Sequence, residues 1–218
     1  MIMENNYKFV FDVETSGLPL RSKSINKKDK YKILKDYDTA RILSLSYIIL
    51  DNDNKEVEKK TYFLKPDNFE ISEESKKIHK ITEEYLQIHG VNHISFYNYI
   101  NRVFHNYKFS RIIAHNINFD INILKSELYR YKYASAIKII ENIELFCTML
   151  QSYDIMSYHK WPKLSEAYQY FYNETTENAH SSEYDTLYCS KIYIKLESII
   201  KKRKQKNEIK NKNKRIKV

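Results

Sequence analysis

Alternating apolar and polar residues mark the first strand of the chain. Between Tyr7 and Glu14, every second residue from Phe9 onward is apolar, whereas Asp12 and Glu14 fall on the opposite side. Side chains two residues apart in a strand point to the same face of the sheet. The pattern therefore predicts a strand with one apolar face, and the Thr-Ser-Gly-Leu-Pro segment that follows ends it.

Apolar runs separated by turn signals and helical patterns continue along the chain. The Asp-Asn-Asp-Asn turn at residues 51–54 predicts a hairpin between the second and third strands. Further strands are predicted over Ile42–Leu50, Val57–Leu64, Arg111–Ala114 and Ile143–Cys147. Helices are predicted in short pieces over residues 70–107, the last over Ser95–Tyr107, and then over Asn118–Tyr131, Leu164–Tyr172 and Ser182–Lys201. A strand meander followed by strands separated by helices predicts an α/β fold, with a mixed sheet flanked by helices.

Two Lys-rich segments differ from this pattern. Residues 21–40 form a long polar excursion, which we expect either to grip a phosphate backbone or to be a disordered, soluble insertion. Residues 201–218 contain ten basic residues and one acidic residue, and so account for the whole net charge of +9. Because this tail has almost no apolar residues and no helical stripe, it is predicted to be disordered. The chain is thus divided into a domain over residues 1–200 and a tail that is a phosphate-binding arm, a nuclear localisation signal or a solvated end.

The composition is typical of one globular domain, with 42% hydrophobic residues. Frequent Lys, Asn, Ile and Tyr, with only two glycines, indicate an AT-rich genome, such as that of a large DNA virus or an AT-rich microbe. Cys147 and Cys189 have no Cys-x-x-Cys partner, so neither a zinc site nor a disulfide framework is predicted. No apolar run reaches the roughly 18 residues of a membrane span, and there is no signal-peptide pattern. We expect an intracellular, soluble protein of the cytoplasm or nucleus, and the oligomeric state stays open.

Asp12 and Glu14 are the first candidate functional residues. On one face of a strand their side chains lie about 7 Å apart. Two such carboxylates repel each other and raise each other's pKa unless a cation compensates for their charge. A pair of solvent-facing acids at a strand end would have the same pattern, so this pair alone is weak evidence for a cation site.

Another acidic residue, Asp120, follows at a junction between a strand and a helix. The segment Ala114–Asp120 leads from a short strand into a helix, with Asn116 or Asn118 as the N-cap. Asp120 then lies in the first helical turn, where the helix dipole favours a carboxylate by about 0.3–1 kcal/mol. Acidic residues near helix caps are common, so a structural role explains Asp120 equally well when it is taken singly.

A histidine and a further acidic residue precede the last long helix. His180 and Asp185 are five residues apart, and along a continuous helix their side chains would point about 140° away from each other. With Ser181 or Ser182 as the N-cap, His180 instead lies before the helix and Asp185 on its first turn. A mobile base beside an anchored carboxylate suits phosphodiester hydrolysis, whereas an isolated histidine before a helix is usually a capping or surface residue.

Taken in order, these segments resemble a known enzyme superfamily. FDVETSGLP, AHNINFD and HSSEYD are similar to the three motifs of the DnaQ-like (DEDDh) exonucleases, which include proofreading exonucleases, RNase T and oligoribonuclease. The segments SKKIHKITEEYL and WPKLSEAYQYFY extend the likeness over Tyr7–Leu196. The resemblance implies a ribonuclease H-like α/β fold. Its mixed five-stranded sheet has an antiparallel meander, then parallel strands, and is flanked by helices.

The resemblance also implies roles for individual residues. The metal ligands of the family match Asp12, Glu14, Asp120 and Asp185, and its general base matches His180. The implied substrate-binding residues are Thr15 and Leu18, at the terminal nucleotide. From their places in the chain, we also expect His79, His115 and Asn116 to contact the substrate. The alternatives are a structural role for His79 and a loop-holding role for His115. Two departures from the family, Lys80 in place of glycine and Ser182 in place of alanine, bear on substrate fit rather than on chemistry.

The implied activity is 3′→5′ hydrolysis of nucleic acid to 5′-mononucleotides with two Mg²⁺ or Mn²⁺ ions. Oxygen ligands favour these ions over zinc, and two ions can activate water and stabilise the leaving oxygen. Stacking on terminal bases does not depend on sequence, so single-stranded or frayed ends are expected, with DNA favoured. An RNA 3′→5′ exonuclease and a non-catalytic nucleic-acid-binding module stay open as alternatives, because no motif reports contact with the 2′-hydroxyl.

Overall fold

A computed structural model describes residues 6–20, 29–178 and 180–215. A five-stranded sheet has the order β3-β2-β1-β4-β5. The strands are β1 (Tyr7–Thr15), β2 (Ile42–Leu50), β3 (Glu56–Phe63), β4 (Phe109–Ala114) and β5 (Glu144–Cys147). The first three strands pair antiparallel as a meander, and β4 and β5 run parallel to β1. The predicted α/β fold, with its mixed five-stranded sheet, is confirmed.

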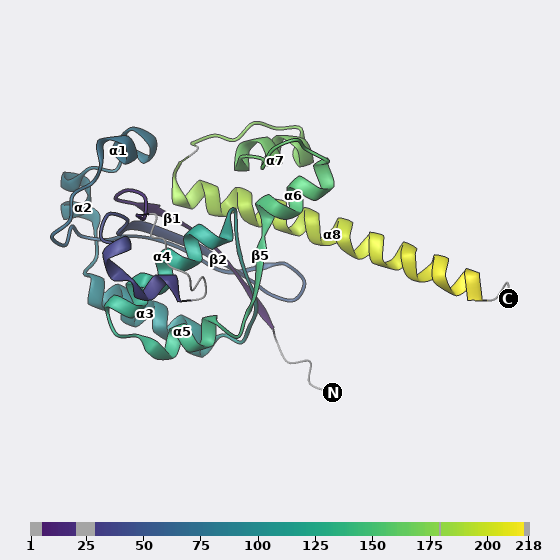
Figure 1. The fold of residues 1–218 in the computed structure, drawn as a ribbon, viewed down its shortest axis with the longest axis horizontal. Helices are drawn as coiled ribbons and strands as arrows, with labels where there is room; N and C mark the ends of the chain where they lie inside the picture. Colours follow the sequence, from purple (N-terminus) through teal and green to yellow (C-terminus); the bar gives the residue numbers. More distant parts are fainter. Residues whose placement is uncertain (1–5, 21–28, 179, 216–218) are drawn as a thin grey trace.

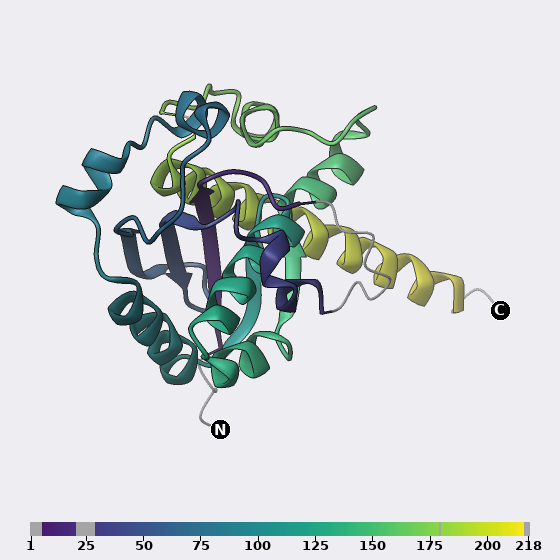
Figure 2. The ribbon, with the colours of Figure 1, turned by 60° about the vertical axis from the view of Figure 1, so that its left-hand side comes forward.

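Helices cover both faces of this sheet (Figure 1, Figure 2). They are α1 (Glu73–His79), α2 (Glu83–His89), α3 (His93–Asn106), α4 (Ile117–Arg130), α5 (Ala134–Ile140), α6 (Thr148–Met156), α7 (Leu164–Tyr172) and α8 (Ser182–Arg215). The sequence did not predict α5 and α6, because one has seven residues and the other follows β5 without a break. Within the described ranges, no helix combines the length and the apolar character that crossing a membrane requires.

β1 has apolar neighbours on both of its faces. Phe9, Phe11 and Val13 belong to a core cluster with side chains from α3, α4 and α5. On the other face, Val10 packs with side chains from α7 and α8. The strand was predicted to have one apolar face, but α8 covers the second face as well. The acidic residues Asp12 and Glu14 lie towards the C-terminal end of this strand.

Residues 201–215 are helical, which corrects the prediction of disorder for this part of the tail at residues 201–218. α8 runs as one helix from Ser182 to Arg215 and extends beyond the body of the molecule (Figure 1). Lys, Arg and Gln have high helix propensities, and an existing helix is extended without a new nucleation step. An apolar stripe is therefore not required here. Residues 216–218 lie outside the described residues.

The second half of the Lys-rich excursion is folded onto the domain. It forms two short 3-10 helices, η1 (Lys30–Lys32) and η2 (Leu34–Asp36). Tyr31 and Tyr37 are buried in the same core cluster as α4. The interpretation of residues 21–40 as a disordered insertion is therefore wrong for this half, because two aromatic side chains anchor it. Residues 21–28 lie outside the described residues.

Candidate active site

The four acidic residues singled out in the sequence meet at one end of the sheet. Asp12 and Glu14 come from β1, Asp120 from the first turn of α4, and Asp185 from the first turn of α8. Carboxylate oxygens of Asp12, Glu14 and Asp185 all lie within 4.8 Å of one another. Asp120 is buried, and its charge raises the pKa of both Asp12 and Glu14. Residues far apart in the chain thus build one acidic pocket.

The end of β4 opens the space that these carboxylates occupy. β4 pairs with β1 only as far as Val10 and Ile113, and the chain then turns into α4. Asn116 occupies the N-cap position in the left-handed conformation, with φ 69°, and its side chain makes no capping hydrogen bond. Asp120 lies in the first turn of α4, as predicted, where the helix dipole favours negative charge.

Burial and mutual repulsion disfavour the ionised forms of these carboxyls. Burial raises the pKa of Glu14 to about 8 and that of Asp120 to about 8, and the Asp185 charge adds to both effects. Burial and the three neighbouring carboxylates hold the pKa of Asp12 well above its usual range. Burial also raises the pKa of Asp185 to about 6, although the nearby His180 acts in the opposite direction. Carboxylates held this close need positive charge between them to ionise together.

His180 lies directly before α8, as the sequence predicted. Its side chain is exposed, its φ is 68°, and its backbone N–H donates to Asp185 Oδ2 at 3.3 Å. α8 begins at Ser182, and the Ser181 carbonyl accepts from the Asp185 N–H at 2.9 Å. The imidazole therefore belongs to a turn outside the helix, next to a carboxylate that the helix fixes.

Three buried serines attach the start of α8 to the sheet. Ser44 and Ser46 of β2 are the strand partners of Glu14 and Asp12. The Ser182 hydroxyl lies 2.9 Å from Ser44 Oγ and 2.8 Å from Ser46 Oγ. The departure from the family alanine thus contributes to packing inside the protein rather than to substrate fit. The signal for this contact in the sequence is a pair of serines at alternate positions of an otherwise apolar strand.

The end of α1 brings His79 next to the site and explains Lys80. His79 is buried and lines a pocket of about 210 Å³ together with His180. Its Nδ1 accepts from the Ile81 N–H at 3.0 Å, and burial lowers its pKa. Lys80 is the left-handed C-cap of α1, with φ 60°, and this conformation favours glycine. The glycine of the family is therefore accounted for by backbone conformation, not by substrate fit.

His115 is half-buried, and bonds within the protein engage its ring, which argues against its predicted contact with substrate. Its Nδ1 lies 3.0 Å from Thr148 Oγ1, and its Nε2 donates to the Pro162 carbonyl at 3.0 Å. Burial lowers the pKa of His115 to about 4, so the ring is neutral at physiological pH. Both ring nitrogens are engaged and none is left for a phosphate, which supports the alternative that His115 holds its loop. Asn116, in contrast, is exposed.

The loop after β1 exposes an apolar side chain at the end of the strand that carries Asp12. Leu18 is 74% exposed, whereas Thr15 is buried and its hydroxyl donates to the Gly17 carbonyl at 2.7 Å. A Cβ on Gly17 would lie 2.5 Å from the Thr39 carbonyl oxygen, so only glycine permits this close approach. The loop is thus held by its backbone, while Leu18 is available to pack against a ligand.

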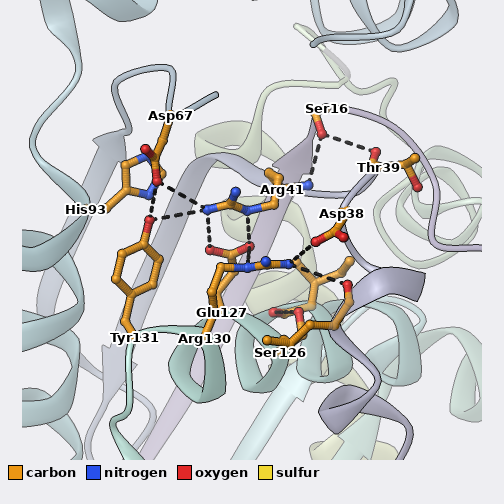
Figure 3. A network of polar contacts seen from close by, with 12 residues as sticks. Ser16, Asp38, Thr39, Arg41, Asp67, His93, Ser126, Glu127, Arg130 and Tyr131 are labelled. Atoms are coloured by element: carbon orange, nitrogen blue, oxygen red, sulfur yellow. Dashed lines mark hydrogen bonds and ion pairs between the residues drawn. The ribbon is translucent and has the colours of Figure 1, made fainter. Parts of the chain in front are cut away.

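A buried ion pair anchors this loop to α4 (Figure 3). The Ser16 hydroxyl donates to the Thr39 carbonyl at 3.1 Å and accepts from the Arg41 N–H at 2.9 Å. The Arg41 guanidinium pairs with Glu127 of α4, whose side chain is fully buried. No sequence motif indicated this pair, because its members lie 86 residues apart. The helix that supplies Asp120 is thereby tied to the loop that carries Leu18.

Comparisons with known proteins agree with this arrangement. The sequence model of the RNase T family, described as "Exonuclease", matches residues 9–193. No curated protein gives a significant match. E. coli exonuclease I in complex with a dT13 oligonucleotide has a TM-score of 0.66 at 18% identity, over 88% of this chain and 40% of that chain. Its complex with dA16 has a TM-score of 0.64 at 17% identity, over 88% and 40%. A product-bound exonuclease I has a TM-score of 0.66 at 15% identity, over 89% and 44%.

These solved structures and the family model support different conclusions. This chain spans only 40–44% of the length of the solved structures, and at 15–18% identity their likeness shows the fold alone. The family model, in contrast, covers most of the 218 residues, including all four acidic positions and His180. The chain therefore belongs to the RNase T exonuclease family, and with it to the DnaQ-like superfamily.

Proposed function

We propose that this chain is a metal-dependent 3′→5′ exonuclease that removes 5′-mononucleotides from single-stranded or frayed DNA ends. The observation that carries the proposal is the convergence of Asp12, Glu14 and Asp185, with carboxylate oxygens within 4.8 Å of one another, around the end of β1 where Asp120 is buried. Phosphodiester hydrolysis requires an activated water and compensation of the charge that develops on the phosphate and the leaving oxygen. Membership of the exonuclease family supports this reaction class.

The donor atoms of the pocket fit two divalent ions of the Mg²⁺ or Mn²⁺ type. All of them are carboxylate oxygens, which suit these hard cations better than zinc. Asp12, Glu14 and Asp185 would hold such ions together with the neighbouring Asp120. When bound, the ions supply a hydroxide at neutral pH and stabilise the negative charge of the transition state. Cations would also offset the repulsion that raises the pKa of these carboxyls.

His180 is assigned the role of general base. An imidazole can accept a proton from water as the water attacks phosphorus. The backbone N–H of His180 is bonded to Asp185, and its side chain is exposed on the turn before α8. The base is thus attached to the acidic pocket through its main chain, and its ring is exposed to solvent.

The loop after β1 is assigned to the terminal nucleotide. Leu18 exposes an apolar side chain that can pack on a base, and Thr15 ends the strand that carries Asp12 and Glu14. Apolar contact with a base face is sequence-tolerant, which suits stepwise degradation of an arbitrary strand. DNA is favoured over RNA because exonuclease I, which has the same fold, was solved with single-stranded dT13 and dA16. Residues 1–200 are proposed to form this catalytic domain.

One digestion experiment tests polarity, substrate and metal dependence together. A 5′-labelled DNA strand should give products that shorten from the 3′ end, and a 3′-labelled strand should release its labelled mononucleotide first. Both reactions should need Mg²⁺ and stop with chelator. Asp12→Asn, which keeps the side-chain volume, is the inactive control. Early release of a 5′ label, or activity in chelator, would overturn the proposal. Faster cleavage of the matching RNA strand would replace DNA by RNA as the substrate.

A further inference from the structure

The last part of α8 carries closely spaced cations away from the body of the protein. α8 packs on the sheet through apolar residues, the last of which are Leu196 and Ile200. Beyond them, the side chains of residues 201–209 are all exposed. The cations among them are Lys201, Lys202, Arg203, Lys204 and Lys206, accompanied by one acidic residue, Glu208. We call residues 201–215 the basic arm.

Lys201 pairs with Glu197 at 3.1 Å, but neither packing nor helix capping accounts for the other cations. Apart from Ile209, the described side chains of the basic arm are polar on every side, so the arm has no face to bury against another protein. The helix dipole favours cations only in the last turn, and Lys206 lies more than two turns before Arg215. Like charges four residues apart, such as Lys202 and Lys206, destabilise a helix by about 0.2–0.5 kcal/mol. A polyanion bound along the arm would relieve this repulsion.

The same helix fixes the distance between the basic arm and the acidic pocket. Asp185 lies in the first turn of α8, and at 1.5 Å per residue Lys201 is about 24 Å and Arg215 about 45 Å further along the axis. A groove of about 520 Å³ lies at the base of the arm, where Lys201 and Lys204 line it together with Glu144 and Glu197. Its lining also includes Asn118, two residues before Asp120 in α4. The edge strand β5 also contributes to the groove.

We propose that the basic arm is a second contact for the single DNA strand whose 3′ end occupies the acidic pocket. This inference rests on the proposed function and adds to it a binding site that only longer strands can reach. Lysine and arginine bind phosphates without regard to sequence, and the binding weakens steeply with salt. At 3.4 Å per stacked nucleotide, a strand needs about seven nucleotides to reach Lys201 from the pocket. A dinucleotide is too short to touch both.

Charge removal within an intact helix tests the basic arm. The arm variant combines Lys202→Gln, Arg203→Gln, Lys204→Gln and Lys206→Gln, because glutamine keeps a helix propensity close to that of lysine. The control variant combines Lys55→Gln, Arg102→Gln, Lys132→Gln and Lys138→Gln at exposed positions outside the arm. Both variants lose three lysines and one arginine, so their net charge is the same.

Two measurements separate the arm from the catalytic pocket. The first is equilibrium binding of a 30-nucleotide oligothymidylate in chelator, as a function of salt. The arm variant should bind about tenfold more weakly or worse. Each phosphate contact contributes about 0.7 to the slope of log K against log salt, so the loss of four cations should reduce the magnitude of that slope by about three. The second is hydrolysis of a dinucleotide in Mg²⁺, which the arm variant should leave unchanged. The control variant should stay within about twofold of the wild type in both.

The outcomes distinguish failure of the arm from failure of the exonuclease. An arm variant that binds the long strand as tightly as the wild type overturns the inference, and so does a control variant that loses as much affinity. A wild type that binds the 30-nucleotide strand through the arm, yet hydrolyses neither that strand nor the dinucleotide in Mg²⁺, overturns the proposed function and leaves the arm supported.

Discussion

At the scale of single residues, the candidate site combines a rigid acidic side with one imidazole on an exposed turn. Asp120 and Asp185 are held by the first turns of two helices, and Asp12 by the central strand. His180 has a left-handed backbone and no packed side chain. Changing the imidazole should therefore affect the reaction, whereas changing the carboxylates should affect both the reaction and the stability of the fold.

His180→Asn should lower kcat by about 10²–10⁴-fold, the range that a general base contributes. Asparagine tolerates the left-handed backbone, so the melting temperature should stay close to that of the wild type. Steady-state hydrolysis of a single-stranded oligonucleotide and thermal unfolding measure the two effects. His159→Asn, a change in another exposed histidine, is the control. A kcat within about threefold of the wild type would contradict the role of His180.

The acidic pocket should make the metal-free protein less stable as pH rises. The pKa of Glu14 and that of Asp120 are about 8 in the folded protein, whereas an ordinary carboxyl has a pKa of about 4. A group whose pKa is raised by folding stabilises the fold below its unfolded pKa, and this contribution disappears as pH rises through the folded pKa. In chelator, the melting temperature should therefore fall as pH rises from about 4 to about 8 and level off above that.

Mg²⁺ should offset this loss, because the ionised carboxylates bind it more tightly. Thermal unfolding across this pH range, with Mg²⁺ and with chelator, measures both effects. Glu14→Gln removes one of the titrating groups and should flatten the pH dependence in chelator. An unchanged pH dependence in this variant would show that the pocket does not govern the stability of the metal-free protein.

Lys80→Gly should raise the stability of the fold by about 0.5–1 kcal/mol. Lys80 has φ 60°, and a side chain in the left-handed region costs about 1–2 kcal/mol. Glycine avoids this cost, but part of the gain is offset because glycine loses more backbone entropy on folding. Urea denaturation measures the change. Lys77→Gly, inside α1, should instead destabilise by about 1 kcal/mol. A loss of stability in Lys80→Gly would mean that the lysine side chain makes a contact that outweighs the backbone cost.

At the scale of elements, α4 joins the site to the rest of the molecule through a buried ion pair. Its first turn supplies Asp120, and its later turns hold Glu127 against Arg41. The Tyr97 hydroxyl also donates to Glu127, at 3.1 Å, so the buried carboxylate is well satisfied. Such a pair need not raise stability over an apolar core, but breaking it leaves a buried charge unpaired.

Glu127→Gln should destabilise the protein by about 3–5 kcal/mol, because the Arg41 guanidinium would lose its buried counter-charge and keep only the more exposed Asp67, 3.7 Å away. The matched control is Glu144→Gln, which removes the exposed partner of Arg111 and should cost at most about 1 kcal/mol. Chemical denaturation gives both values. Equal losses in the two variants would mean that burial does not set the strength of the Arg41 pair.

At the scale of the whole molecule, the sheet could be predicted because its signals are local. Alternation and turn residues gave β2 its observed bounds and placed β1 and β3 within one residue of theirs. A hairpin pairs neighbouring strands antiparallel, and a helical connection makes the next strands parallel, so the mixed sheet follows from the order of elements. The four acidic residues converge because each lies at the end of such an element, where the ends of β1 and β4 meet.

The remainder depends on contacts between distant residues, or on a weak signal that was misread. The attachment of Ser182 to Ser44 and the Arg41–Glu127 pair span more than 80 residues and leave no local trace. The hydrogen bonds of His115 to Thr148 and to the Pro162 carbonyl likewise join distant segments, and no sequence motif predicts them. The basic arm was misread for another reason, since the lack of an apolar stripe excludes packing but does not exclude a helix.

Because β1 is the central strand, the two sides of the site should differ in their rates of amide hydrogen exchange. β1 has a strand on each edge and a core on each face, so its amide hydrogens should exchange with deuterium only when the whole sheet opens. α1 and α2 are seven-residue helices with one buried side chain each, and their amides should exchange far sooner. The carboxylates of Asp12 and Glu14 would then stay in place while the wall that carries His79 opens and recloses, which provides a path for a strand to enter sideways.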